Sequence, residues 1–405
     1  MNKNIFIYTS LFPYSMVSES FLSTELDIVK GMYDITIIPI GKDSVSREVD
    51  SRIRVDNSIC GSSLLYKLLS FVLIFRGIII RELVKSGEFR CMFKYPRDLV
   101  KYLYATNLVY LDIKKRIKSN PDACFYSYWF SYPPIAFAIY KSLYPKTSAR
   151  FICRAHGSDV YSVDIGTYYP LRLFASKYID KVFAVSQYGK DYLINKYSVL
   201  VNKVFVSRLG VKDPQLPSYK RNDNSITHLV SCSRMIALKR IPLIYKSIAN
   251  YAQNNGSTQF KWSHLGGGPS MKAVLNEIEV TAAPSNLSIE LKGELNNSEI
   301  LDFYKNNSVD CFILLSTSEG VPVSIMEAMS YSIPVLSTNV GGISELVIGG
   351  AGELLNVDFS QTQFNEALNR ILGNLQVYKN NSFLAYKNNY DAEKNYHNFY
   401  QMALE

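Results

Sequence analysis

The chain has 405 residues, enough for two domains, and its 47% hydrophobic and 20% charged residues exclude a disordered protein. Six scattered cysteines without a C-x-x-C pair and four dispersed histidines indicate buried thiols in a reducing cytosol, with no zinc site. The net charge of +9 is uneven: residues 1–217 carry 30 Lys and Arg against 18 Asp and Glu, whereas residues 218–405 carry 14 against 17. We therefore expect only the first half to face an anionic partner.

The first residues predict a strand over Ile5–Thr9, followed by a loop. They contain one basic residue and a short apolar run without a small-residue cleavage site, which is not typical of a signal peptide, so we expect a cytoplasmic protein. Residues 19–32 predict a crossover helix, because Phe21, Leu22, Leu26 and Val29 recur at helical spacing. The isoleucine-rich run 33–40 predicts a second buried strand.

Residues 64–118 form a basic segment, with 12 Lys and Arg against 4 Asp and Glu beside aliphatic runs. Its apolar stretch Leu68–Ile80 is interrupted by Arg76 and is too short to span a bilayer. Such a segment is typical of contact with an anionic membrane surface, and the alternative is a core helix with solvated lysines. No nucleic-acid-binding motif accompanies the charge, so we expect no nucleic acid partner. A membrane contact would include the cluster Lys114, Lys115, Arg116 and Lys118.

Strand-like and helix-like stretches alternate along the rest of the chain. Further strands are predicted within 123–130, 149–157, 181–186, 226–234, 260–269, 287–294, 309–317 and 333–339. This alternation predicts two doubly wound α/β domains with parallel sheets, facing across a cleft. The aperiodic run 207–225, rich in Pro, Asp, Asn and Ser, predicts their junction. Ligands of such sheets bind beyond the carboxyl ends of the strands, so the loops after strands are the candidate sites.

Three of these loops contain residues suited to ligand binding: a histidine, a pair of cations and a run of glycines. His156 follows the strand within 149–157, and we expect it to be exposed to the cleft, with a functional and a structural role both open. Arg234 and Lys239 follow the strand within 226–234, where they are suited to neutralise a diphosphate, one as a fork and the other as a point charge. Gly266–Gly268 is a glycine turn that permits close backbone approach, but it lacks the G-x-G-x-x-G signature of dinucleotide sites.

Two glutamates lie at the end of the strand within 309–317. Glu319 stands in the loop, and Glu327 stands three residues after Ser324, a pattern that predicts a capping box at the start of a helix. The backbone between them, at a helix N-terminus, suits an anion. A glycosidase-like acid and base would flank the scissile bond from opposite faces, whereas both carboxylates here come from one wall. Hydrogen bonding to sugar hydroxyls therefore suits them better.

The stretch Ser318–Val347 resembles the E-x7-E donor-site signature of glycosyltransferase family 4, whose members are retaining enzymes of GT-B fold. The segments 233–241, 266–269 and 291–300 resemble the phosphate clamp and the motifs that separate it from the signature in this family. The segments 154–160 and 207–214 resemble its N-terminal His-Gly segment and its interdomain junction. The glycine pair that many members carry in the first N-terminal loop is missing here, and Ser332 replaces a usual helix-ending glycine.

The resemblance implies two Rossmann-like domains. Residues 1–213 would face the acceptor and the membrane, residues 214–386 would bind the nucleotide sugar, and a helix over 387–405 would cross back to the first domain. It also implies a metal-independent, retaining transfer of a hexose from a nucleotide-diphosphate sugar to a saccharide acceptor. We expect the acceptor to be linked to polyprenyl diphosphate, in surface-polysaccharide (O-antigen or capsule) synthesis at the inner face of the cytoplasmic membrane.

The resemblance assigns roles by position. Arg234 and Lys239 would hold the diphosphate, Glu319 would contact hydroxyls of the donor sugar, Glu327 would bind the ribose and His156 would contact the sugar ring. The remaining donor-site positions are backbone contacts at Gly267, Gly320, Val321, Pro322 and Val323. The leaving diphosphate itself would take the acceptor proton. Two alternatives stay open: another GT-B activity, such as a nucleotide-sugar epimerase or phosphorylase, and a non-catalytic sugar- or lipid-binding module.

Overall fold

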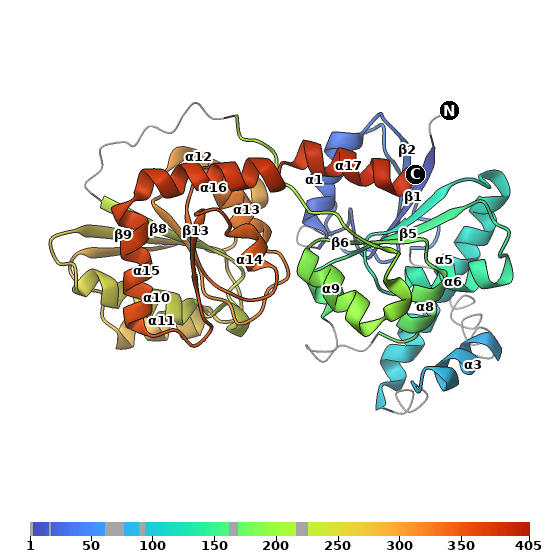
Figure 1. Cartoon of the computed structure of the whole chain (residues 1–405), viewed down its shortest axis with the longest axis horizontal. Coiled ribbons are helices and arrows are strands. Elements are labelled where there is room, and N and C mark those ends of the chain that lie inside the picture. Colours follow the sequence, from blue (N-terminus) through green and yellow to red (C-terminus); the bar gives the residue numbers. More distant parts are fainter. Residues whose placement is uncertain (1–2, 16–17, 61–76, 89–93, 162–168, 216–225) are drawn as a thin grey trace. The chain divides into compact units, whose positions relative to one another are not determined.

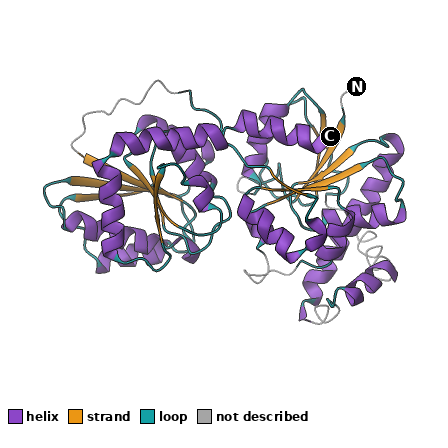
Figure 2. Cartoon of the chain, in the orientation of Figure 1, coloured by secondary structure: helices purple, strands orange, loops and turns teal. Residues whose placement is uncertain are grey.

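The computed structural model describes residues 3–15, 18–60, 77–88, 94–161, 169–215 and 226–405 (Figure 1). The chain divides into two compact units, Met1–Arg208 with Tyr396–Glu405 and Leu209–Asn395. In each unit, helices cover a single parallel sheet, as Figure 2 shows. The sequence predicted this doubly wound α/β architecture for both halves, and the prediction is confirmed.

The first unit contains a seven-stranded sheet of order β3-β2-β1-β4-β5-β6-β7, in which every neighbouring pair is parallel. Its strands are β1 (Asn4–Thr9), β2 (Asp34–Pro39), β3 (Arg54–Val55), β4 (Cys124–Ser127), β5 (Arg150–Ala155), β6 (Lys181–Ala184) and β7 (Val204–Val206). Its helices are α1 (Ser20–Val29), α3 (Gly77–Lys85), α5 (Pro96–Ser119), α6 (Pro133–Leu143), α7 (Gly157–Val160), α8 (Arg172–Tyr178) and α9 (Gln187–Lys196), with a 3-10 turn η1 (Ser198–Leu200).

Both faces of this sheet are buried, because alternate residues of a strand point to opposite faces. Ile5 and Ile7 of β1 pack in the cluster that also contains the apolar residues of α1. Phe6 and Tyr8 pack in the other cluster, with residues of α5, α6 and α8. Burial on both faces explains why the central strands are nearly continuous apolar runs.

The second unit contains a six-stranded parallel sheet of order β10-β9-β8-β11-β12-β13. Its strands are β8 (Ile226–Cys232), β9 (Gln259–Leu265), β10 (Leu287–Leu291), β11 (Cys311–Leu314), β12 (Val335–Thr338) and β13 (Gly352–Leu355). Its helical elements are η2 (Ala237–Lys239), α10 (Ile241–Gln253), α11 (Met271–Val280), α12 (Asn297–Asn306), α13 (Val323–Ser330), α14 (Ile343–Leu346), α15 (Gln361–Gly373) and α16 (Leu375–Asn389).

The final helix, α17 (Ala392–Leu404), begins in the second unit and ends in the first. The sequence placed the domain changes after residues 213 and 386, whereas the units change after residues 208 and 395. The reason is local pairing: the Val211 N–H donates to the Tyr390 carbonyl at 3.0 Å, and the Ala392 N–H donates to the Val211 carbonyl at 3.1 Å. These bonds hold both ends of the second unit together. The helix expected over 387–405 is interrupted between α16 and α17.

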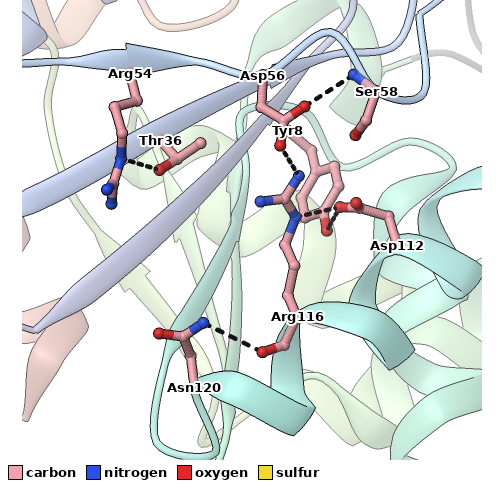
Figure 3. A network of polar contacts seen from close by, with 8 residues as sticks. All are labelled: Tyr8, Thr36, Arg54, Asp56, Ser58, Asp112, Arg116 and Asn120. Atoms are coloured by element: carbon pink, nitrogen blue, oxygen red, sulfur yellow. Dashed lines mark hydrogen bonds and ion pairs between the residues drawn. The ribbon is translucent and has the colours of Figure 1, made fainter.

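The basic segment is only partly exposed. The guanidinium of Arg116 in α5 donates to Asp112 at 2.7 Å and to Asp56 at 2.6 Å, while the Tyr8 hydroxyl donates to Asp112 at 2.7 Å (Figure 3). Arg116 therefore ties α5 to the sheet and is not available to a membrane, which corrects its place in the predicted contact cluster. The other three members of that cluster are exposed: Lys114, Lys115 and Lys118.

None of the described helices combines the length and the hydropathy that crossing a bilayer requires. Most of the apolar stretch 68–80 lies outside the described residues, which resume at Gly77 in α3. Among the described cysteines, Cys60 is partly exposed, and the others are buried: Cys124, Cys153, Cys232 and Cys311.

Candidate functional site

The glycine turn after β9 packs directly against the loop after β8. The Met235 N–H donates to the Gly267 carbonyl at 2.7 Å. A Cβ at Gly266 would lie 2.1 Å from the Ser233 carbonyl oxygen, and one at Gly268 would lie 2.6 Å from the Met235 carbonyl oxygen. Only glycine permits this approach. The turn thus supports the loop that carries the two predicted phosphate ligands, with Gly267 in backbone contact beside them.

The two predicted cations lie on that loop in different surroundings. Arg234 is exposed, and its guanidinium makes no hydrogen bond or ion pair with any described residue. Lys239 ends the turn η2, and its ammonium pairs with the Glu319 carboxylate. The next residue, Arg240, is structural: its guanidinium donates to the carbonyl of Leu315 and, at 2.9 Å, to that of Val357. Arg234 therefore offers a fork of donors that no described residue occupies, on the same loop as the paired lysine.

Glu319 lies in the loop after β11, held against the loop after β8. The Thr317 N–H donates to the Leu238 carbonyl at 3.0 Å, one residue before Lys239. The side chains of Lys239 and Glu319 are only 17% and 9% exposed, so their ion pair is largely shielded from water and is screened less by salt than a surface pair. The two residues were predicted to contact different groups of one ligand, and here they contact each other.

A second glycine pair fixes the backbone of Glu319. The Gly342 N–H donates to the Gly320 carbonyl at 2.8 Å. Gly341 has φ +55°, and a Cβ there would lie 1.8 Å from the Glu319 carbonyl oxygen. Both glycines lie within the stretch Ser318–Val347, but no separate role was predicted for them. The sequence feature that could have revealed their role is a pair of glycines directly after a strand, β12, at the carboxyl edge of the sheet.

The helix after this loop begins earlier than predicted. α13 starts at Val323 with Pro322 as its N-cap, and no described side chain caps it. Ser324 is thus the second helical residue, and the predicted capping box between Ser324 and Glu327 is wrong. Proline at the N-cap cannot supply a side-chain acceptor, so the first-turn N–H groups remain suited to an anion. Gly320 and Val321 lead into this helix start.

Glu327 bonds to α12 and not to its own helix. Its Oε1 accepts a hydrogen bond from the Asn297 side-chain amide at 2.5 Å. The side chain is 7% exposed, and this burial raises the pKa of Glu327 to about 7, against the lowering effect of the Asn297 bond. Asn297, the first residue of α12, is a candidate site residue that the sequence reasoning missed. The sequence feature that could have revealed Asn297 is its place at the first position of a predicted helix that follows a strand.

His156 follows β5 in the first unit and is 7% exposed, so the expectation of an exposed imidazole is wrong. Its ring lies 4.8 Å from the Tyr128 ring and 4.7 Å from the Trp129 ring, centroid to centroid, and these aromatics cover it. Its Nε2 lies 3.1 Å from the Tyr128 carbonyl oxygen. Burial, reinforced by the nearby Arg154 charge, lowers the pKa of His156 to about 3, so the imidazole is neutral near pH 7.

The structure brings all predicted residues of the second unit to one edge of its sheet. They are Arg234, Lys239, Gly267, Glu319, Gly320, Val321, Pro322, Val323 and Glu327. His156 occupies the equivalent edge of the first unit, after β5. Carboxyl edges of parallel sheets are where ligands bind in doubly wound folds.

Comparison with known proteins agrees with this architecture. Residues 227–387 match the family described as Glycosyl transferases group 1. The chain is 27% identical over 194 residues to the O-antigen biosynthesis glycosyltransferase WbnH of Escherichia coli, covering 45% of this chain and 51% of that protein. It is 27% identical over 237 residues to an uncharacterized glycosyltransferase of Methanocaldococcus jannaschii, covering 58% and 62% respectively. The chain thus spans about half the length of the first curated relatives it matches.

Solved structures resemble the whole chain. The lipopolysaccharide outer core galactosyltransferase WaaB in its apo form has a TM-score of 0.69 at 15% identity, with 99% of both chains covered. Anabaena HepE in complex with UDP-glucose has a TM-score of 0.68 at 13% identity, again with 99% of both chains covered. At these identities the likeness shows the fold. The fold is GT-B, as the sequence predicted.

Proposed function

We propose that this chain, a GT-B protein with a glycosyl transferases group 1 domain, transfers a hexose-type sugar from a nucleotide-diphosphate sugar to a saccharide acceptor with retention of configuration. The observation that carries the proposal is the shielded Lys239–Glu319 ion pair, whose lysine lies on the same loop after β8 as Arg234, a guanidinium without a partner among the described residues. A diphosphate needs cations, and a sugar needs hydrogen-bond acceptors. Here both lie in one place, at the edge of the sheet.

Donor binding exchanges partners within this pair. Lys239 leaves the carboxylate for the diphosphate, and Glu319 leaves the ammonium for hydroxyls of the donor sugar. Each buried charge keeps a partner throughout, which limits the cost of separating them. Arg234 joins Lys239 on the diphosphate through its fork of donors.

The nucleotide end of the donor is assigned to the start of α13 and to Glu327. The diphosphate meets the first-turn N–H groups of α13, with Gly320 and Val321 close in sequence. Glu327 accepts from the ribose hydroxyls, and its bond from Asn297 fixes the direction of the carboxyl group. The ionised carboxylate offers acceptors to both hydroxyls of a diol, whereas the protonated form gives up acceptor capacity to its own O–H, so we expect binding to strengthen as pH rises past about 7.

The chemistry follows from where charge develops. As the bond from the anomeric carbon to the diphosphate oxygen breaks, negative charge grows on the leaving diphosphate, where Lys239 and Arg234 stabilise it. The acceptor hydroxyl attacks from the same face and gives its proton to that diphosphate oxygen, so configuration is retained. No metal ion is assigned, because the two cations supply the charge. The predicted contact with the sugar ring stays assigned to His156, whose imidazole is neutral.

We assign the acceptor to the lipid-linked saccharides of surface-polysaccharide synthesis, in keeping with the O-antigen role stated in the name of WbnH. The first unit supports a peripheral contact with the inner face of the cytoplasmic membrane. In α3, the apolar side chains of Ile80 and Val84 are exposed beside those of Arg81 and Lys85. Apolar and basic side chains on one helix are typical of anionic membrane surfaces.

The donor-site assignment is tested with a panel of nucleotide sugars. Wild-type protein, with EDTA present, is assayed for hydrolysis, transfer and thermal stabilisation, and Lys239→Ala and Glu319→Ala are compared with it. We expect both variants to lose about 100-fold or more of the activity. The control is Arg370→Ala, which breaks an exposed ion pair with Glu353 away from the site and should change nothing. If both site variants keep transferring sugar, the chain is not a transferase of this kind.

Membrane contact is tested by flotation with liposomes that contain phosphatidylglycerol. Replacing Arg81 and Lys85 with glutamine should weaken binding severalfold, and wild-type binding should fall as salt rises. Replacing the exposed Lys114, Lys115 and Lys118 instead locates the contact along α5. Binding that neither variant nor salt alters would argue against an electrostatic membrane surface in this unit.

A further inference from the structure

The two tryptophans of the chain have different surroundings. Trp262 of β9 is 0% exposed, and its indole N–H donates to the Ser231 hydroxyl at 3.0 Å, so it belongs to the core of the second unit. Trp129 follows β4 at the carboxyl edge of the first sheet and remains partly exposed. Its ring packs beside that of His156, at a centroid distance of 4.7 Å. An indole held at a ligand-binding edge with part of its surface exposed is suited to contact a ligand.

A buried carboxylate holds the indole of Trp129 in place. Glu19 accepts from Trp129 Nε1 at 2.6 Å, and from the N–H groups of Ser10, Leu11 and Phe12 at 2.7, 2.9 and 2.7 Å. Glu19 is 4% exposed and has φ +56°, a conformation that costs a non-glycine residue free energy. The carboxylate thereby joins the loop after β1 to the tryptophan with all its acceptor sites in use. The indole N–H is satisfied, so any contact with a ligand is made by carbon atoms of the ring.

The backbone around Trp129 is fixed as well. The Ser127 hydroxyl donates to the Trp129 carbonyl at 2.6 Å. The Asp159 carboxylate accepts from the N–H groups of Phe130 and His156, each at 2.6 Å, and so links the tryptophan loop to the histidine loop. A ring held at this many points loses little entropy when a ligand binds it, which is the requirement for a preformed binding surface.

We infer that Trp129 is a stacking platform for a pyranose ring, held by Glu19 and placed beside His156. One face of a pyranose presents mainly C–H bonds, which pack against the electron-rich face of an indole, while the hydroxyls at the rim need polar partners. The inference rests on the proposed sugar transfer, to which it adds a residue of the first unit. The pyranose is either the sugar being transferred or a sugar of the acceptor.

A binding measurement tests the platform without any enzymatic assay. The chain contains two tryptophans, and the buried Trp262 should not respond to a ligand at the other unit. We expect methyl glycosides of glucose, galactose, mannose or N-acetylglucosamine to change the emission of wild-type protein and to leave that of Trp129→Phe unchanged. An equal response in Trp129→Phe, or no response of wild type to any of these glycosides, would overturn the inference. Thermal melting of the variant checks that it is folded.

Kinetics then identify the source of the sugar. In Trp129→Leu, a platform for the acceptor raises KM for the saccharide about tenfold and leaves hydrolysis of the nucleotide sugar unchanged. A platform for the donor sugar lowers hydrolysis and transfer together. Tyr144→Leu is the control, because Tyr144 is a 42% exposed aromatic that packs on Tyr140 elsewhere in the same unit. Full activity of Trp129→Leu with unchanged KM refutes the platform and leaves the transferase intact. A wild-type protein that binds glycosides but processes no nucleotide sugar refutes the transferase instead.

Discussion

Substituting Gly341 by alanine should disable the donor site from a position that contacts no ligand. The added Cβ would lie 1.8 Å from the Glu319 carbonyl oxygen, and contacts under 3.0 Å are not tolerated, so the Glu319 loop must move by about 1.2 Å. A misplacement of about 1 Å in a catalytic site costs about 100-fold in rate. We therefore expect kcat/KM for the nucleotide sugar to fall about 100-fold, measured by steady-state hydrolysis and transfer.

The chain offers a matched control for the backbone effect of this change. Gly349 has φ +61°, close to the +55° of Gly341, but a Cβ at Gly349 would meet nothing within 4 Å. Both alanine variants should lose about 1 kcal/mol of stability from the left-handed conformation, and Gly341→Ala should lose more. Only Gly341→Ala should lose activity. Equal kinetics for the two variants would show that the glycine does not position Glu319.

Three further predictions concern stability. Burial raises the pKa of Glu327 from 4.5 to about 7, so its protonated carboxyl contributes stability that is fully present below pH 4.5 and is lost as pH rises through 7. In Glu327→Gln, the melting temperature should therefore change less between pH 5 and pH 8 than it does in the wild-type protein. Ser332 has φ +61° just after α13, so Ser332→Gly should stabilise the fold by up to about 1 kcal/mol in chemical denaturation, and a loss would contradict the strain. Arg116→Met leaves the carboxylate of Asp112, whose side chain is 3% exposed, without the guanidinium and with the Tyr8 hydroxyl as donor, and should cost about 3 kcal/mol in denaturant melts, whereas Lys114→Met should cost under about 0.5 kcal/mol. If Arg116→Met and Lys114→Met lose similar amounts of stability, the hydrogen bonds of Arg116 do not stabilise the fold.

The order of strands and helices was predictable because burial on both faces of a parallel sheet leaves a strong apolar signal. The strands that the sequence reasoning missed are the short ones at sheet edges, β3, β7 and β13. β3 contains only Arg54 and Val55, and neither is buried. An edge strand of two to four residues with mixed polarity does not differ from a loop in composition.

The candidate site was predictable where its residues lie in loops that directly follow strands. It was not predictable where contacts between distant side chains decide the arrangement. Lys239 and Glu319 were identified by their positions in such loops, but only the structure shows that their charges pair. The predicted cap at Ser324 failed because a Ser-x-x-Glu pattern is local, whereas Glu327 found its partner 30 residues away, in Asn297. His156 was expected to be exposed, and it is covered by rings from the loop after β4, a contact that no local pattern reveals.

Residues 396–405 complete the core of the first unit, and this has a consequence for how the protein is made. Phe399 lies under the buried Arg154 guanidinium at 4.2 Å from ring centroid to Cζ, and the Tyr400 hydroxyl donates to the buried Glu25 at 3.0 Å. During synthesis, some 200 residues of the first unit leave the ribosome without these partners, while domains ordinarily fold in order as they emerge. Until residues 396–405 are made, the apolar face they cover stays open, as does the buried pair of Glu25 and Arg154, whose charged groups lie 3.8 Å apart. The nascent first unit should therefore depend on chaperones until residues 396–405 have been synthesised, and deleting these residues should prevent it from maturing.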